Sequence, residues 1–258
     1  MLEQQIIDVR GGHRQIIFTK GEGPPVIWLH DMNGVEAGHP VIDELARTNR
    51  VIAPQAPGFD DLAELAEIRN IHELAIYYDD VMEALGIDQA PVVGHSFGAM
   101  IGAELAAHFP GRVSRLVLIA PLGLWNDEYP VPDMFAVPYH ELPELLYAEP
   151  PARAAASPVV DVEALVRLSQ GMTTVAKFFW PIPDRGISRR LGRVTAPTLL
   201  VFGDCDKLVP VRYADDWVSL VPNATKVVIS GAGHMVPIER PTEVCEAVRS
   251  FLAELVPA

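Results

Sequence analysis

The stretch VVGHSFG, residues 92–98, joins the end of a short apolar run to a segment with helical spacing, residues 97–108. It contains the pattern glycine-x-serine-x-glycine in a strand–turn–helix context, where a serine hydroxyl can be exposed at a sharp turn. Such a turn holds the serine in a strained conformation and requires small residues two positions away on each side. Gly94 and Gly98 meet this requirement, so we expect the Ser96 hydroxyl to project from the turn.

Short runs rich in apolar and β-branched residues on both sides of this stretch predict strands. They cover residues 4–9, 15–20, 26–29, 51–53, 91–93, 116–120, 198–202 and 226–229. Helical spacing is found at residues 41–48, 71–85, 97–108, 213–221 and 242–255. The Arg-Gly-Gly-His stretch at 10–13 predicts a hairpin, whereas the later alternation requires parallel strands and right-handed crossovers. The sequence therefore predicts an α/β fold with a doubly wound, mostly parallel eight-stranded sheet and an antiparallel start.

The alternation stops between Pro121 and Pro197, where a long proline-rich stretch contains no convincing strand. Helical patterns occur there at residues 140–148, 160–179 and 187–193. Because a structureless loop of this length is improbable, residues 122–194 are predicted to form a helical cap inserted after the sixth strand. Residues 1–121 and 195–258 then form the core, and most apolar residues of the cap are expected to pack within the cap.

The chain has 258 residues, with 20 Lys and Arg against 34 Asp and Glu, and a formal net charge of −14. This balance disfavours nucleic acid and anionic membrane surfaces as partners. Without a signal-like or membrane-spanning apolar block, the protein is predicted to be cytoplasmic. Cys205 and Cys245 fit no metal-ligand spacing, so neither a metal nor another cofactor is expected.

A serine hydroxyl becomes a good nucleophile when a base takes its proton and an acid orients that base. The GDCDKLVP stretch at residues 203–210 follows one predicted strand and offers two carboxylates, Asp204 and Asp206. His234 follows the last strand, and no other of the eight histidines does. Since the carboxyl ends of parallel strands share one edge of a sheet, we expect these groups to meet Ser96 there.

Taken together, these motifs resemble the α/β-hydrolase superfamily over essentially the whole chain, in particular its capped serine hydrolases. Carboxylesterases and meta-cleavage product hydrolases are both similar in this respect. Beyond the serine motif, the matching pieces are His30 at the end of the third strand, PQAPGF at 54–59, GDCDKLVP at 203–210 and GAGHMVPIERP at 231–241.

The resemblance implies that Ser96 is the nucleophile and His234 the general base. The family's acid usually stands three residues after a glycine and shortly before Val-Pro, which matches Asp206. Asp204 is then expected to cap a turn or bind backbone groups.

By position, the resemblance assigns the backbone N–H groups of Met32 and Phe97 to an oxyanion hole, which binds negative charge as it develops. Relatives usually have a glycine where this chain has Asp31. A carboxylate at that place would oppose an anionic transition state. We therefore expect the Asp31 side chain to point away from the hole, either as a surface residue or as a cap of the turn at Asn33-Gly34.

Residues that flank this site or lie at the edges of the cap are candidates for the substrate pocket. They are His30, His95, Leu124, Trp125, Met172, Phe179 and Met235. The cap contains few cations, and Arg189-Arg190 is expected to form a solvated face. A mainly apolar small molecule is therefore the predicted substrate, and the chain is expected to be a monomer or a homodimer.

Two activities fit these expectations. The first is hydrolysis of small carboxylic esters through an acyl-enzyme, and the second is hydrolysis of a carbon–carbon bond in products of aromatic ring cleavage. Enzymes of the second kind often have Asn before the nucleophile and an aromatic residue after the base, where this chain has His95 and Met235. Ser96 excludes dehalogenases and epoxide hydrolases, which use a carboxylate nucleophile, and a non-catalytic ligand-binding role is the third alternative.

Overall fold

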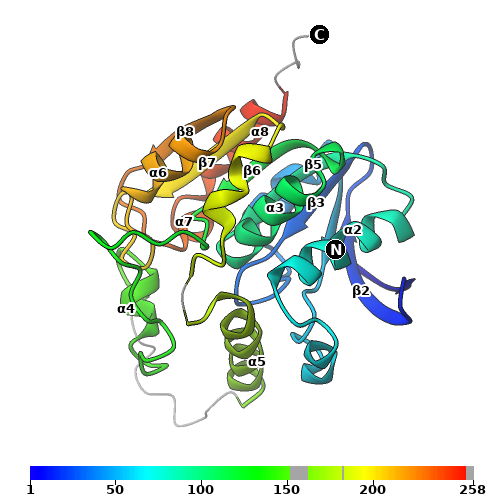
Figure 1. Ribbon diagram of the computed structural model, residues 1–258, viewed down its shortest axis with the longest axis horizontal. Coiled ribbons are helices and arrows are strands. Elements are labelled where there is room, and N and C mark those ends of the chain that lie inside the picture. The colour runs from blue at the N-terminus through cyan, green and yellow to red at the C-terminus, as the bar shows by residue number, and fades with distance from the viewer. Residues whose placement is uncertain (152–161, 182, 254–258) are drawn as a thin grey trace.

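A computed structural model describes residues 1–151, 162–181 and 183–253. At its centre lies an eight-stranded sheet in the order β1-β2-β4-β3-β5-β6-β7-β8 (Figure 1). The strands are β1 Glu3–Val9, β2 His13–Lys20, β3 Pro25–Leu29, β4 Arg50–Pro54, β5 Ala90–His95, β6 Val113–Ile119, β7 Thr198–Gly203 and β8 Ala224–Ile229. The predicted α/β fold with its eight strands is confirmed.

The sheet begins antiparallel and continues parallel, as the hairpin pattern indicates. β1 pairs with β2, and β2 pairs with β4, in antiparallel register, while the pairs from β4 through β8 are parallel. The hairpin turn uses Gly11 and Gly12 at φ 88° and 83°, a region that glycine adopts without steric cost. The parallel part therefore brings the carboxyl ends of β3 and β5 to β8 to one edge.

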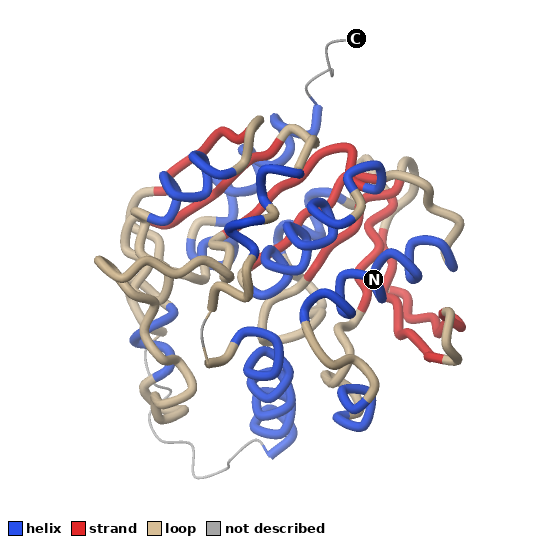
Figure 2. Tube along the Cα trace, viewed as in Figure 1, coloured by secondary structure: helices blue, strands red, loops and turns tan. Residues whose placement is uncertain are grey.

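Helices cover both faces of this sheet (Figure 2). Helices α1 (Pro40–Leu45) and α8 (Pro241–Ala253) contribute to the core on one face. Helices α2 (Ile71–Ala84), α3 (Phe97–His108) and α6 (Tyr213–Leu220) contribute to the core on the other. The short helix α7 (Val236–Glu239) and the 3₁₀ helices Leu62–Ala66 and Pro110–Arg112 complete the layers.

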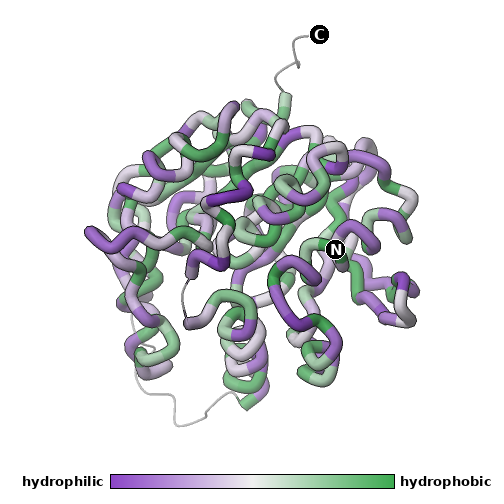
Figure 3. Tube along the Cα trace, in the orientation of Figure 1, coloured by the Kyte–Doolittle hydropathy of each residue, from purple (hydrophilic) through white to green (hydrophobic). Residues whose placement is uncertain are grey.

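Burial on both faces explains why the central strands β3 to β7 are mostly apolar rather than alternating. In β3, Val26 and Trp28 belong to the core beneath α1 and α8, whereas Ile27 and Leu29 belong to the core beneath α2 and α3. Figure 3 shows the hydrophobic residues concentrated along these central strands. The fold thus holds the ends of the strands rigidly on a two-sided core.

The insertion between β6 and β7 contains helices α4 (Leu142–Leu146) and α5 (Val162–Phe179) and the 3₁₀ helices Ile187–Arg189 and Leu191–Arg193. In Figure 1, α4 and α5 lie beyond the sheet on the side away from the C-terminus. Residues 160 and 161, with which the predicted helix begins, lie outside the described residues.

The apolar residues of the insertion do not form a core of their own, contrary to the prediction. Leu124, Met134, Leu146 and Phe178 join the same buried cluster as α2 and α3. The insertion therefore shares the core of the sheet, because α4 and α5 contact residues that follow the strands, such as Met235 and Met32. The exact boundary at residues 122 and 194 stays a prediction.

No helix within the described ranges is long and apolar enough to cross a membrane. The cytoplasmic location stays a prediction.

Candidate active site

The turn between β5 and α3 is built as the sequence predicts. Ser96 has φ 54° and ψ −112°, a strained conformation for a residue with a side chain. A Cβ atom on Gly94 would lie 2.5 Å from the carbonyl oxygen of Gly98, and one on Gly98 would lie 2.0 Å from that of Leu29. Only glycine fits at both positions, and the Ser96 N–H is fixed by a 2.8 Å hydrogen bond to Ile119 O.

Three predicted residues form one buried chain of hydrogen bonds at this turn. Ser96 Oγ lies 2.7 Å from His234 Nε2, and His234 Nδ1 lies 2.9 Å from Asp206 Oδ2. The other Asp206 oxygen accepts from the N–H groups of Leu208 and Val209 at 2.9 and 2.8 Å. Asp206 can therefore accept the Nδ1–H of His234, which leaves Nε2 free to accept the serine proton.

The second carboxylate, Asp204, does not reach this chain. It accepts hydrogen bonds from Gly231 N at 2.7 Å, Ser230 Oγ at 3.0 Å and Cys205 Sγ at 3.2 Å. These donors, the Cys205 thiol foremost, lower the pKa of Asp204. Asp204 thus ties the ends of β7 and β8 together, in keeping with the predicted contact to the backbone.

The two backbone donors assigned by position, Met32 N–H and Phe97 N–H, have no acceptor among the described residues. Phe97 begins α3, and the first N–H groups of a helix have no partner within it. Both donors are therefore available to a ligand beside Ser96.

His30 holds the loop that carries Met32. Its Nδ1 lies 2.7 Å from Asp31 O, and its Nε2 accepts the N–H of Ala56 at 2.8 Å. Burial lowers the pKa of His30, which favours the neutral ring that these two contacts require. Because both nitrogens bind the main chain, His30 supports the loop instead of offering a polar group to the predicted pocket.

Asp31 caps the turn as expected, accepting from Asn33 N at 2.8 Å and from Asn33 Nδ2 at 3.1 Å. Of the two expected positions, capping holds and the surface does not, because Asp31 is only 7% exposed and its Oδ2 lies 3.4 Å from Nδ1 of the fully buried His95. Burial raises the pKa of Asp31, but the His95 ring and the Asn33 N–H outweigh it and hold that pKa at about 2. Both ring nitrogens of His95 face protein groups, Asp31 Oδ2 and the backbone oxygen of His234, so this ring does not offer a free polar group to the predicted pocket.

The remaining pocket candidates separate into buried and exposed residues. Leu124, Met172, Phe179 and Met235 are buried. Met172 also lines a groove of about 360 Å³ between α5 and residues 135–139. Trp125 differs from the prediction, because it is 40% exposed and its indole N–H donates to Asp127 at 2.7 Å. Sequence spacing could not distinguish Trp125 from its buried neighbour.

Helix α5 packs against Met32 and Phe97, the two residues with the unpaired N–H groups. A Cβ atom on Gly171 would lie 2.0 Å from the carbonyl oxygen of Met32. The ring of Phe178 stacks on that of Phe97, with centroids 6.2 Å apart. No sequence pattern indicates a role for Gly171, because its close contact is with a loop far away in the chain.

The segment around α4 forms hydrogen bonds with the residues that follow His234 and Asp206. Met235 N donates to Leu146 O at 3.0 Å, and Lys207 Nζ donates to the carbonyl oxygens of Glu144 and Tyr147 at 3.1 and 3.3 Å. The Glu239 carboxylate accepts from Gly233 N at 2.7 Å and from Ala148 N at 2.9 Å. Lys207 and Glu239 lie within recognised motifs, but no pattern reveals their partners.

A cluster with possible metal ligands lies elsewhere, between α2 and α3. His72, Glu104 and His108 have ligand atoms within 4.8 Å of one another. Both Glu104 oxygens, however, accept from the Arg190 guanidinium, at 2.9 and 2.5 Å. Arg190 is therefore the partner of a buried carboxylate and not the solvated residue predicted. Because both Glu104 oxygens are bound to Arg190, the cluster is an ion-pair network and not a metal site.

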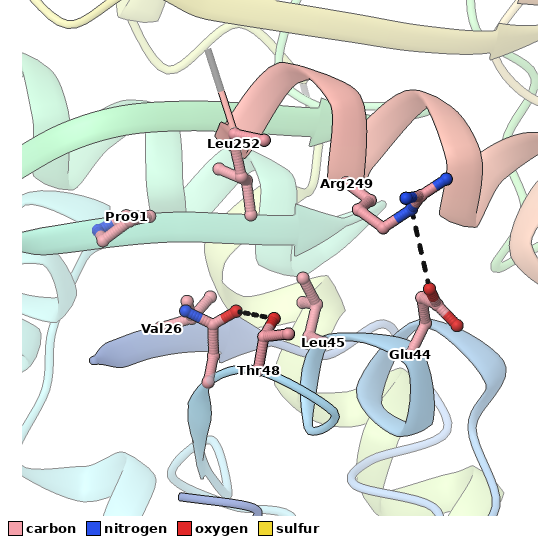
Figure 4. Close-up of a pocket in the computed structure, with 9 residues that line it drawn as sticks. Val26, Glu44, Leu45, Thr48, Pro91, Arg249 and Leu252 are labelled. Atoms are coloured by element: carbon pink, nitrogen blue, oxygen red, sulfur yellow. Dashed lines mark hydrogen bonds and ion pairs between the residues drawn. The ribbon is translucent and has the colours of Figure 1, made fainter. Parts of the chain in front are cut away.

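The pocket in Figure 4 is also separate from the candidate active site. It has a volume of about 150 Å³ and is lined by Val26 of β3 and by residues of α1 and α8. Glu44 and Arg249 form an ion pair at 3.7 Å on its rim. Val26 and Pro91 stand near the starts of β3 and β5, whereas the Ser96 site lies at the strand ends.

Comparison with known proteins identifies relatives in sequence and in fold. The chain is 26% identical to 2-hydroxymuconate semialdehyde hydrolase of Pseudomonas putida, over 94% of this chain and 92% of that protein. Its fold is similar to a meta-cleavage product hydrolase from Pseudomonas fluorescens IP01, with TM-score 0.75, 22% identity, and coverage of 96% and 97%. It is equally similar to naproxen esterase, a carboxylesterase from Bacillus subtilis, with TM-score 0.77, 18% identity, and coverage of 98% and 92%.

Residues 23–247 match the family model described as the alpha/beta hydrolase family. This match spans most of the sheet, the insertion and all the residues of the candidate site. The chain therefore belongs to the alpha/beta hydrolase family and is a hydrolase of that fold.

Proposed function

We propose that the protein hydrolyses small, mainly apolar carboxylic esters through an acyl-enzyme, with Ser96, His234 and Asp206 as its catalytic triad. The observation that carries this proposal is the continuous hydrogen-bonded chain from Ser96 through His234 to Asp206. We assign the N–H groups of Met32 and Phe97, which have no acceptor among the described residues, to the oxyanion hole.

Each step follows from these contacts. Ser96 Oγ attacks the ester carbonyl carbon while His234 Nε2 takes its proton, and the carbonyl oxygen becomes an anion that the two N–H groups stabilise. The protonated His234 then gives its proton to the departing alcohol, leaving an acyl group on Ser96. Water, deprotonated by His234, releases the acid and regenerates the serine. Asp206 holds His234 in the required tautomer throughout.

The preference for neutral substrates is supported by the charges near the site. Lys177 on α5 donates to Leu65 O, and Arg190 is neutralised by Glu104. Lys177 and Arg190 are thus not free to pair with an anionic substrate, whereas buried apolar residues such as Met235 favour an apolar one.

The second candidate is hydrolysis of a carbon–carbon bond in aromatic ring-cleavage products. The named relatives favour it, since 2-hydroxymuconate semialdehyde hydrolase matches nearly the full chain. A 2-hydroxy-6-oxo-2,4-heptadienoate hydrolase of Pseudomonas putida is 27% identical over 94% of both chains. Such a dienoate carries a carboxylate, and the described cations do not offer it an obvious partner.

A comparison of kcat/KM for p-nitrophenyl butyrate and for a ring-cleavage dienoate tests the proposal. Both substrates are measured with the wild-type protein and with Ser96→Ala, which removes the nucleophile. We expect the ester to be preferred, and a preference for the dienoate of about a hundredfold would replace the ester by the carbon–carbon substrate. Turnover of neither substrate, without covalent labelling of Ser96, would favour a ligand-binding role.

A further inference from the structure

The Asp31–His95 pair adjoins the candidate active site, because Asp31 precedes Met32 and His95 precedes Ser96, and the mechanism above does not use it. His95 is fully buried and Asp31 nearly so. His95 Nδ1 faces Asp31 Oδ2 at 3.4 Å, an ion-pair contact without the geometry of a hydrogen bond. On the opposite side of the ring, His95 Nε2 lies 3.0 Å from the backbone oxygen of His234. The pair thus connects the loop carrying Met32 to the backbone of the base.

The protons of this pair can be counted from its neighbours. The His234 carbonyl oxygen only accepts hydrogen bonds, and so does an ionised Asp31 carboxylate. A neutral imidazole has one N–H, so the ring that donates to His234 O would turn a lone pair toward the carboxylate. Both contacts become favourable only with one further proton, carried by the ring or by the carboxyl group. The pair then has no net charge.

The other titratable groups around Asp31 do not supply a compensating positive charge at neutral pH. Burial lowers the pKa of His39 to about 4, and both nitrogens of His30 bind the main chain. Burial and the Asp31 charge raise the pKa values of Glu36 and Tyr147, neither of which carries positive charge. Of the groups facing Asp31, His95 is the one suited to balance it.

We propose that Asp31 and His95 form a positioning pair, in which one shared proton keeps the region behind the oxyanion hole neutral while His95 holds the backbone of His234. Neutrality matters because Met32 is the next residue after Asp31. A buried carboxylate without a counter-ion would oppose the negative charge that develops on the substrate oxygen. This inference rests on the proposed function, since it assumes that such a charge develops at Met32 N–H.

A double-mutant cycle tests the pair. In His95→Gln, the amide can still donate to His234 O, but it cannot supply a proton to Asp31. We expect kcat for p-nitrophenyl butyrate to fall about 10- to 100-fold, with a smaller change in KM, because the affected charge develops in the transition state. Adding Asp31→Asn removes the uncompensated charge and should restore most of this loss. His140→Gln, which changes an exposed histidine, is the matched control.

The pH profile provides a readout that a purely structural role would not move. In His95→Gln, Asp31 must bind a proton itself to become neutral, so activity relative to wild type should fall as pH rises. The double variant should return to the wild-type profile. The inference is wrong if the losses of kcat in His95→Gln and in Asp31→Asn add in the double variant. It is also wrong if His95→Gln keeps the wild-type pH profile.

Two further measurements separate the possible failures. Fluorophosphonate labelling and ester turnover of the wild-type protein test the proposed function, and their absence would overturn that function rather than the pair alone. If His95→Gln folds poorly, the thermal midpoints of the single and double variants report the same coupling. The double variant should then be the more stable of the two, and equal or lower stability would contradict the pair.

Discussion

The two described helices of the insertion meet the candidate active site in different ways. The α4 segment is joined to the base and acid loops by hydrogen bonds, including Met235 N to Leu146 O and Lys207 Nζ to Glu144 O. Helix α5 meets the oxyanion loop by direct packing, with Gly171 against the Met32 carbonyl. The base side thus depends on polar contacts that can be lost singly, whereas the oxyanion side depends on the absence of a side chain.

The largest expected effect lies at the acid on the base side. Asp206→Asn should lower kcat about 10⁴-fold, because the amide cannot hold His234 in the required tautomer. Asp204→Asn should have a much smaller effect, since Asp204 binds Ser230 and Gly231 and does not contact His234. Steady-state kinetics of the two variants checks this order. A larger loss of kcat in Asp204→Asn would show that Asp204, and not Asp206, is the acid of the triad.

A smaller effect is expected on the oxyanion side. Gly171→Ala places a Cβ atom where the Met32 carbonyl stands, so α5 or the loop must move. Because a displacement of about 1 Å can cost about 100-fold, we expect kcat to fall about 10- to 100-fold. Gly192→Ala is the control, because a Cβ atom there meets nothing within 4 Å. Equal kinetics for both variants would show that this contact does not position Met32.

The smallest effect should come from a single polar contact of the α4 segment. Lys207→Met removes the donor to the Glu144 and Tyr147 carbonyls, at an exposed position. Since a hydrogen bond contributes about 1 kcal/mol net, we expect KM to rise a few-fold at nearly constant kcat. Lys226→Met, at a lysine paired with Asp215, should leave KM unchanged. If Lys207→Met lost as much kcat as Gly171→Ala, the proposed difference between the base side and the oxyanion side would be wrong.

The sequence predicts those parts of the molecule whose determinants are local. Helix α3 begins at Phe97 and ends at His108, as predicted. The glycines on either side of Ser96 predict a sharp turn, and the structure shows that only glycine fits there. The triad partners could be inferred because parallel strands deliver their following loops to one edge. Asp206 was separated from Asp204 by family resemblance, and the hydrogen bonds now give the physical reason.

The errors concern side chains whose partners lie far away in the sequence. No pattern near Asp31 indicates its contact with His95, and the sequence predicts a solvated Arg190 because its partner Glu104 belongs to another helix. Trp125 and Leu124 are adjacent apolar residues in an irregular segment, where no periodicity tells which one is buried. Contacts between residues so distant in the sequence depend on how the elements pack together in the folded protein.

The central claim is that Ser96 is a nucleophile activated by His234. Labelling with a fluorophosphonate, followed by mass spectrometry of the digested protein, tests this claim most directly. We predict one label, on the peptide containing Ser96, with no labelling of Ser96→Ala and much slower labelling of His234→Ala. Equal labelling of wild type and Ser96→Ala, or a label on another residue, would contradict the account.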